Sequence, residues 1–477
     1  MDHEQFRRDA HALVDWMADY LRDVERYPVR SQARPGEIAA RIPGSPPEAG
    51  EAMDRIMADF EADVLPGITH WQHPNFFAYF PANASPPSVL AEMLTATLGV
   101  QGMLWQTSPA ATELETRMMA WLRQMIGLPE GFHGVIQDSA SSATLCALLS
   151  ARERACNWCG NEQGLAAQAD RLTVYASEEV HSSIDKNVMI AGFGRENLRK
   201  IATDDTFALR PEALARAIET DLAHGLRPVC VVATLGTTGV AGFDPVRAIG
   251  EICRAHGVWL HVDAAWAGSA LILPAQRWMI DGIAHADSFV FNPHKWLFTN
   301  FDCTAYFVRD PEALTRTLSV SPVYLRSREG DQVIDYSNWS IPLGRRFRAL
   351  KLWFVIRAYG VETLRRMVAA HIAWAQELAE TVAAEADFEL LAPARLALFN
   401  FRYHPAGVDD EAALDRLNER LLDTINDGGK LYLTRNTVRG RFAIRFAVGQ
   451  TTTTRAHVQR AWVYIKDAAA ACRDAGS

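Results

Sequence analysis

The stretch Ser288-Phe289-Val290-Phe291-Asn292-Pro293-His294-Lys295-Trp296 places a lysine just past a short apolar run. Residues 288–291 predict a short buried strand. Lysine is rarely buried unless it is paired or used, and in a desolvated pocket its pKa falls. The free amine then becomes a nucleophile toward an aldehyde. The alternative is a surface lysine on a loop, and this stretch alone leaves both possibilities open.

Other apolar runs repeat this pattern through the middle of the chain. Further candidate strands lie at residues 134–137, 172–176, 229–234, 258–262 and 304–308. Amphipathic helical patterns separate most of them. Continuous apolar runs that alternate with helices predict an α/β fold with a mostly parallel sheet covered on both faces.

The N-terminal segment, residues 1–75, is predicted to be helical. Apolar residues recur at steps of three and four from Phe6 to Val24, and Pro28 ends this helix. A second helix is expected to be capped by Ser45, to begin at the following prolines and to run to about Val64. Two such helices cannot bury their apolar faces alone, so we expect them to pack on another domain or subunit.

The large domain is predicted at residues 76–354 and a small C-terminal α/β domain at 355–477. In the latter, strands are expected at 388–391, 397–403, 430–434 and 442–448, with the last two pairing across the Arg439-Gly440 turn. Helices are expected at 411–427 and from about Thr454 onward.

Composition excludes several classes of protein. The 477 residues carry a formal net charge of -9 and no basic tract interleaved with aromatics, which argues against a nucleic-acid partner. No apolar run reaches the roughly 18 residues of a membrane helix. The charged N-terminus is not typical of a signal peptide. Seven cysteines, an odd number, suit reduced thiols and predict a cytoplasmic protein. Cys156 and Cys159 lack the second pair that a zinc site needs, so no metal is predicted.

Two further motifs follow predicted strands. Asp263 closes an apolar strand, where a buried carboxylate needs a partner such as a pyridinium N–H; the alternative is a helix N-cap. The small residues of 137–144 (QDSASSAT) precede an apolar helix, so their backbone N–H groups could hold a phosphate, or they are a plain capping run. The glycine fingerprint of dinucleotide-binding oxidoreductases and the P-loop lysine are both missing.

His181 follows another predicted strand and could stack on a flat ring or serve as a hydrogen-bonded scaffold residue. Together, the four motifs fall at the ends of successive strands of one predicted sheet, where ligands bind in open α/β folds. Together they predict one pyridoxal-phosphate site. It would have a phosphate-binding helix terminus, a histidine that stacks on the ring, an aspartate that binds the ring nitrogen and a lysine that reacts with the aldehyde.

The chain also closely resembles the aromatic-L-amino-acid decarboxylases, group II members of the fold-type I pyridoxal-phosphate enzymes. The resemblance spans nearly the whole length and includes residues 73–81 (HPNFFAYFP), 108–115 (SPAATELE), 233–238 (ATLGTT), 261–265 (HVDAA), 292–296 (NPHKW) and 341–348 (IPLGRRFR). The resemblance therefore implies the fold-type I transferase-like fold.

The resemblance also implies roles in cofactor binding. Lys295 would carry pyridoxal 5'-phosphate as a Schiff base, Asp263 would bind the ring nitrogen, and His181 would stack on the ring. Residues near the phosphate or ring would be Ser139, Ala140, Ser141, Asn292 and Thr238.

For the substrate, the resemblance implies a homodimer whose N-terminal helices wrap the partner and whose active sites lie at the interface. Candidate pocket residues are Trp71, Phe80, Met103, Leu104, His181 and Gly344. The first four are apolar or aromatic, which suits aromatic side chains better than glutamate. Gly344 resembles indole-accepting relatives, where tyrosine-preferring ones carry serine. Ala82 departs from the family, because many relatives have threonine there.

Tyr324 matches the tyrosine that helps to protonate the substrate carbon after carbon dioxide leaves. The resemblance thus implies decarboxylation of tryptophan, tyrosine, phenylalanine or DOPA to the arylalkylamine. Phenylalanine usually stands at this position in aldehyde-forming relatives. Two alternatives stay open: an aromatic acetaldehyde synthase on the same scaffold, and a catalytically silent cofactor-binding scaffold.

Overall fold

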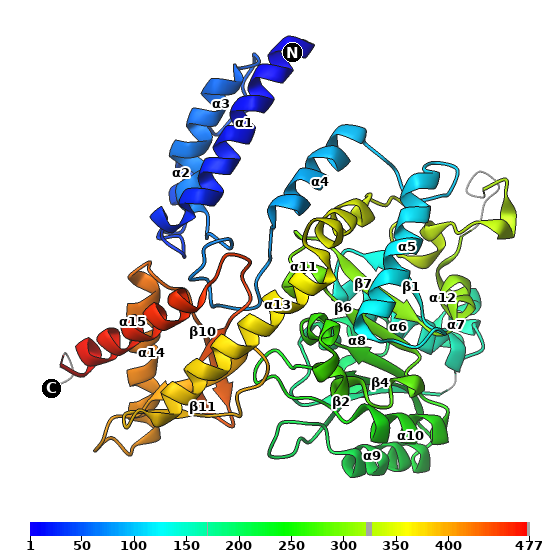
Figure 1. Cartoon of the computed structure of the whole chain (residues 1–477). Coiled ribbons are helices and arrows are strands. Elements are labelled where there is room, and N and C mark those ends of the chain that lie inside the picture. The colour runs from blue at the N-terminus through cyan, green and yellow to red at the C-terminus, as the bar shows by residue number, and fades with distance from the viewer. Residues whose placement is uncertain (169, 321–326, 475–477) are drawn as a thin grey trace. The chain divides into compact units, whose positions relative to one another are not determined.

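A seven-stranded sheet forms the centre of one of two compact units in the computed structural model (Figure 1). The structure describes residues 1–168, 170–320 and 327–474. The unit with this sheet comprises residues 82–376 and 392–399, and the other unit comprises 1–81, 377–391 and 400–477. The N-terminal helices and the C-terminal sheet therefore belong to one unit, while the three-part domain division stays a prediction.

The large sheet has the strand order β1-β7-β6-β5-β4-β2-β3. Its strands are β1 (His133–Gln137), β2 (Leu172–Ser177), β3 (Leu198–Ile201), β4 (Arg227–Thr234), β5 (Trp259–Asp263), β6 (Ser288–Phe291) and β7 (Thr304–Val308). All neighbours are parallel except β7, which runs antiparallel to both β6 and β1. All strands except β7 therefore end at the same edge of the sheet.

The mostly parallel sheet is confirmed, and the six predicted strands occur within two residues of their expected bounds. β3 was not predicted. This strand has only four residues, pairs with β2 alone, and carries the polar Arg199 and Lys200 at its centre. A short polar edge strand lacks the continuous apolar run that marks the others.

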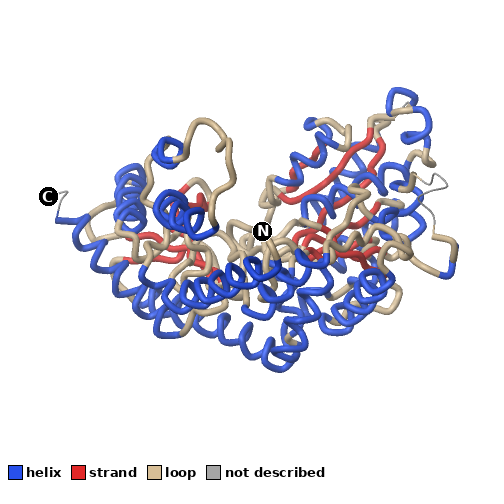
Figure 2. Tube along the Cα trace, turned by 90° about the horizontal axis from the view of Figure 1, so that it is seen from above, coloured by secondary structure: helices blue, strands red, loops and turns tan. Residues whose placement is uncertain are grey.

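Helices lie among the strands of each unit, as Figure 2 shows in blue and red. In the unit with the large sheet they are α4 (Pro86–Leu98), α5 (Pro109–Ile126), α6 (Ala140–Ala155), α7 (Cys159–Gln163), α8 (Ser183–Ile190), α9 (Pro211–Ala223), α10 (Val246–His256), α11 (Pro293–Trp296) and α12 (Pro311–Leu318). Buried side chains of α6 and α8 pack against β2, β4 and β5 in one apolar cluster. The long α13 (Arg348–Ala384) consists of two helices joined at Gly360, whose φ is 71°.

The other unit holds a four-stranded sheet of order β10-β11-β9-β8. Its elements are α1 (His3–Asp23), α2 (Glu37–Arg41), α3 (Met53–Asp59), β8 (Phe388–Leu390), β9 (Leu398–Tyr403), α14 (Glu411–Asp427), β10 (Thr434–Val438), β11 (Arg441–Ala447) and α15 (Arg455–Asp474). The Val29 N–H of the N-terminal segment donates at 2.8 Å to the carbonyl of Gly429, which lies between α14 and β10. None of the helices in the described ranges is long and apolar enough to cross a membrane.

Two predicted elements were misplaced. The second helix does not start at the prolines after Ser45; α3 begins at Met53, and a separate short α2 precedes it. The strand predicted at 430–434 begins only at Thr434. There the Asn426 side chain bonds both the N–H (3.0 Å) and the carbonyl (3.1 Å) of Leu433, so these backbone groups are not available to a ladder.

A buried ion pair joins α5 to the loop that follows Trp339. Arg345 Nη2 lies 2.6 Å from Glu115 Oε1, and both side chains are at most 5% exposed. Glu115 Oε1 also accepts the Ile136 N–H at 2.8 Å, which connects the pair to β1. Arg345 donates in addition to the Ile136 carbonyl at 2.6 Å.

We expect Glu115→Ala to lower the free energy of unfolding by about 3–5 kcal/mol, because it leaves the Arg345 charge buried without its partner. Urea denaturation measures this change. Asp281→Ala is the matched control, since it breaks the exposed Arg247–Asp281 pair and should change stability little. Equal effects of the two substitutions would contradict the prediction.

Candidate active site

The polar residues predicted from four motifs lie at one edge of the large sheet. Ser139 follows β1, His181 follows β2, Asp263 ends β5 and Lys295 follows β6. Thr238 follows β4 and is half-buried. Three of these residues act on one another: the charges of Lys295 and Asp263 both influence the pKa of His181, and those of Lys295 and His181 influence that of Asp263.

Asp263 is a carboxylate held in a desolvated position. Its residue is only 5% exposed, and Oδ1 accepts the Ala265 N–H at 2.9 Å. Burial raises the pKa of Asp263, while the positive charge of Lys295, the Ala265 hydrogen bond and His181 act in the opposite direction. A cationic ring N–H at this carboxylate would stabilise its ionised form.

Lys295 sits in the one-turn helix α11, with the main chain fixed on both sides. Its N–H donates to the Asn292 carbonyl at 2.9 Å, and its carbonyl accepts Asn83 Nδ2 at 2.6 Å. The neighbouring Trp296 stacks on Trp266 with ring centroids 5.0 Å apart. Half-buried and next to a buried carboxylate, Lys295 fits the predicted amine nucleophile better than a loop lysine on the surface.

His181 is exposed on this chain, and a local contact sets its tautomer. The backbone N–H of Ser183 donates to Nδ1 at 3.2 Å. Because a backbone N–H only donates, Nδ1 is the acceptor and the neutral ring carries its proton on Nε2. Partial desolvation lowers the pKa of His181, and the charge of Lys295 lowers it further. The ring is therefore neutral near pH 7 and can lie against a flat apolar face.

The N-terminus of α6 supplies the anion-binding end of the site. Ser139 is the N-cap, and its Oγ accepts the Ser142 N–H at 3.2 Å. The first N–H groups of a helix, here those of Ala140 and Ser141, have no acceptor within the helix and favour anions. Asn187 Nδ2 holds the Ser141 carbonyl at 2.8 Å, which fixes this turn.

Asn292 is oriented by a neighbour on β7. Thr304 Oγ1 donates to Asn292 Oδ1 at 2.9 Å, so the amide group turns its NH₂ away from Thr304. Sequence reasoning missed Thr304 as well as Asn83 and Asn187. No local pattern marks these three residues, because their partners lie elsewhere in the chain.

A second missed group lies behind Asp263 on the same face of β5. His261 Nε2 contacts Thr144 Oγ1 at 3.0 Å, and Nδ1 contacts Ser288 Oγ at 2.8 Å. Burial lowers the pKa of His261 to about 3, so this ring stays neutral. Trp259 Nε1 donates to the same Ser288 hydroxyl at 2.9 Å. These bonds connect β5 to α6 and β6, the elements that carry the anion-binding end and Lys295.

The predicted substrate residues are divided between the two units. Leu104 is buried, Met103 half-buried and Gly344 exposed in the unit with the large sheet. Trp71 and Phe80 belong to the other unit. There Trp71 packs on Phe76 with ring centroids 4.4 Å apart, and the Arg445 guanidinium lies 4.5 Å from the Phe80 ring. Tyr324 lies outside the described residues.

This set of groups fits pyridoxal phosphate. The cofactor requires an amine for its aldehyde, a carboxylate for its ring nitrogen and an anion-binding helix terminus, and all three occur at this edge. Within residues 1–168, 170–320 and 327–474, no group of three or more histidine, cysteine or acidic side chains is arranged to hold a metal.

Comparison with known proteins decides the family. A sequence model described as the pyridoxal-dependent decarboxylase conserved domain matches residues 35–404. The chain belongs to this family. It is 43% identical to a phenylacetaldehyde synthase of Arabidopsis thaliana (98% of this chain, 96% of the relative) and 41% identical to a tyrosine decarboxylase of Papaver somniferum (98% and 95%).

Solved structures agree with this assignment. Oryza sativa TDC with PLP and tryptamine superposes with a TM-score of 0.95 at 37% identity, covering 98% of both chains. Membership in the family confirms the predicted fold class, the pyridoxal-phosphate cofactor and the class of the enzyme, a carboxy-lyase.

The buried histidine predicts how stability depends on pH. The folded-state pKa of His261 is about 3, whereas an unfolded histidine titrates near about 6.5. Between these values the unfolded chain binds a proton that the folded chain does not, so stability falls as the pH drops. We expect His261→Gln to lose less unfolding free energy between pH 7 and pH 4 than the native chain, as measured by urea denaturation across pH. Equal losses would contradict this prediction.

We expect Asp263→Asn to weaken retention of pyridoxal phosphate by at least about 100-fold, the effect of removing one partner of a buried charge pair. Dialysis followed by absorbance of the bound cofactor measures retention. The exposed Asp281→Asn serves as the control and should retain cofactor like the native enzyme. Unchanged retention in Asp263→Asn would show that Asp263 does not hold the ring.

Proposed function

We propose that the chain decarboxylates aromatic L-amino acids, namely tryptophan, tyrosine, phenylalanine or DOPA, to the corresponding arylalkylamine and carbon dioxide. The observation that supports it most is that His181, Asp263 and Lys295 lie at the ends of the parallel strands β2, β5 and β6, at one sheet edge of a pyridoxal-dependent decarboxylase. A tyrosine decarboxylase and TDC with bound tryptamine are among the similar proteins.

When bound, pyridoxal phosphate supplies an aldehyde that links to amines and a protonated ring that accepts the electron pair of the breaking carboxylate bond. On this proposal, Lys295 contributes the amine that the substrate replaces. Asp263 keeps the ring nitrogen protonated, because its buried carboxylate is stabilised only next to a positive charge.

The remaining site residues bind and orient. His181 would cover one ring face with a neutral imidazole, and Thr238 would lie near the ring. The phosphate would be held at the N-terminus of α6 by Ser139, Ala140 and Ser141, and by the oriented amide of Asn292. These residues would hold the cofactor and orient the substrate for loss of its carboxylate.

The substrate side chain is proposed to lie against Trp71, Phe80, Met103, Leu104 and Gly344, together with His181. Apolar walls favour an aromatic ring, whereas an acidic side chain would lack a charged partner among them. We further propose a homodimer, in which the 103–105 segment serves the active site of the partner. Helix α4 exposes the apolar side chains of Leu90, Leu94 and Leu98, and such a patch is consistent with a subunit interface.

The alternative is an aromatic acetaldehyde synthase, which the similarity to a phenylacetaldehyde synthase favours. That reaction consumes the amino acid, dioxygen and water, and releases aldehyde, carbon dioxide, ammonia and hydrogen peroxide. Decarboxylation needs no dioxygen but requires a proton at the substrate carbon, the role proposed for Tyr324. Retention of both Lys295 and Tyr324 argues against a catalytically silent scaffold.

Product analysis tests the proposal. Cofactor-loaded enzyme is incubated with tryptophan, tyrosine, phenylalanine, DOPA and, for comparison, glutamate, and amine, aldehyde and peroxide are quantified. We expect amine from the aromatic substrates without stoichiometric peroxide. Lys295→Ala is the control and should show no turnover above background. Aldehyde with equimolar peroxide would favour the synthase, and turnover of glutamate alone would overturn the proposed substrate class.

A further inference from the structure

One carboxylate, that of Asp335, joins two segments that are distant in the sequence. Its Oδ1 accepts the Trp105 N–H at 2.9 Å and the Ser327 hydroxyl at 2.7 Å. Its Oδ2 accepts the Ser327 N–H at 3.0 Å. Ser327 Oγ in turn accepts the Gln106 N–H at 3.4 Å. A single side chain therefore fixes the main chain at both Trp105 and Ser327.

Both segments bear on the proposed active site. Met103 and Leu104, which directly precede Trp105, are proposed to face the substrate in the active site of the partner subunit. Ser327 is buried and follows Tyr324, the proposed proton donor, by three residues in the sequence. The Met103 carbonyl accepts the Ser337 N–H at 2.9 Å. The main chain two residues after Asp335 therefore also binds the segment that includes Met103.

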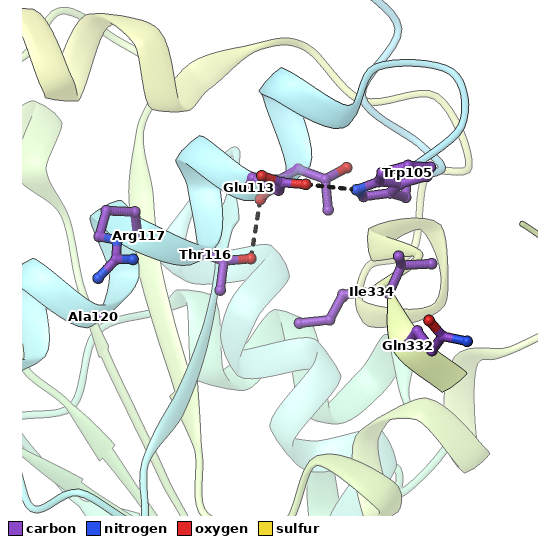
Figure 3. Close-up of a pocket in the computed structure, with 9 residues that line it drawn as sticks. Trp105, Glu113, Thr116, Arg117, Ala120, Gln332 and Ile334 are labelled. Atoms are coloured by element: carbon purple, nitrogen blue, oxygen red, sulfur yellow. Dashed lines mark hydrogen bonds between the residues drawn. The ribbon is translucent and has the colours of Figure 1, made fainter. Parts of the chain in front are cut away.

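The residue next to Asp335 is fixed by its own contacts, and a second carboxylate, that of Glu113, binds a different part of Trp105. Tyr336, the next residue, is buried and lies 3.0 Å from Thr116 Oγ1 on α5. Trp105 has a second carboxylate partner, because its Nε1 donates to Glu113 Oε1 at 3.0 Å (Figure 3). Trp105, Glu113 and Ile334 line a common pocket of about 500 Å³. Glu113 thus holds the indole ring, whereas Asp335 holds the backbone.

We propose that Asp335 is a positioning residue that fixes the Trp105 and Ser327 segments relative to each other and thereby influences turnover and the choice between amine and aldehyde. The effect on products rests on the proposed function. Three donors meet one carboxylate, and hydrogen bonds to a charged acceptor are shorter and stronger than neutral ones. An asparagine at this position would have only one acceptor oxygen. Its NH₂ group would face one of the hydrogen-bond donors that the carboxylate now accepts, so that hydrogen bond would be lost.

The experiment compares four variants of the full-length, cofactor-loaded enzyme. Asp335→Asn removes the charge, and Ser327→Ala removes only the hydroxyl bridge. Glu113→Gln is the matched control, since it changes the other carboxylate at Trp105 without touching Ser327. Tyr324→Phe defines the product ratio expected when proton delivery fails. For each variant we would measure cofactor absorbance, kcat/KM with tryptophan and tyrosine, and the aldehyde-to-amine ratio.

We expect native cofactor absorbance in Asp335→Asn, but kcat/KM about 10- to 100-fold lower, the range for losing hydrogen bonds to a charged group, and a higher aldehyde fraction. Ser327→Ala should change both quantities in the same direction by less, and Glu113→Gln should keep the native product ratio. Native kcat/KM and product ratio in both Asp335→Asn and Ser327→Ala would overturn the proposal, as would an equal shift of product ratio in Glu113→Gln.

A readout independent of catalysis separates this proposal from the proposed function. Trypsin cleaves after Arg328, the exposed residue that follows Ser327. Loss of the Asp335 contacts should raise the initial cleavage rate at Arg328 several-fold, because local opening controls proteolysis. If the native enzyme made no product from aromatic amino acids, the proposed function would fail, while faster cleavage would still support the anchoring role. Unchanged cleavage in Asp335→Asn would overturn that role.

Discussion

The arrangement of this active site depends on the burial of the Asp263 carboxylate. A carboxylate at the end of a central strand is costly to desolvate unless positive charge lies nearby. Lys295 supplies part of that charge, and its effect on the pKa of Asp263 opposes that of burial. The parallel sheet makes this possible, because β5 and β6 end side by side and bring the two residues to one edge. On the proposed function, a protonated cofactor ring at this carboxylate would complete the compensation.

Whether a strand could be predicted from the sequence depends on its position in the sheet, central or at the edge. Strands such as β4 and β6, buried on both faces, show continuous apolar runs that the sequence displays directly. β3 has polar residues because it is an edge strand, and its role appears only when β2 is beside it. The start of β10 was misplaced because Asn426 competes for the backbone of Leu433, an interaction that no local pattern encodes.

The site residues likewise divide into those with a local sequence pattern and those set by contacts between distant segments. Lys295, Asp263, His181 and Ser139 follow strands and have unusual neighbours, so local sequence indicates their chemistry. Asn83 could not be found in this way, since it contacts the Lys295 carbonyl across 212 residues of sequence. The His261 group is likewise built from three separate elements. Residues predicted to do the chemistry leave local patterns, whereas the residues that hold them in place are defined by contacts between distant segments.

Overall similarity does not separate the two candidate reactions. The chain is 43% identical to a phenylacetaldehyde synthase and 41% identical to a tyrosine decarboxylase over nearly the same length. The fold and the cofactor are therefore compatible with both outcomes, and the difference must depend on a few groups that deliver a proton or admit dioxygen. Such a choice is sensitive to position as well as to residue type, since small displacements of a reacting group change rates strongly. Carboxylates that hold main-chain segments, such as Asp335, are for this reason as relevant to the product as the residues that touch the cofactor.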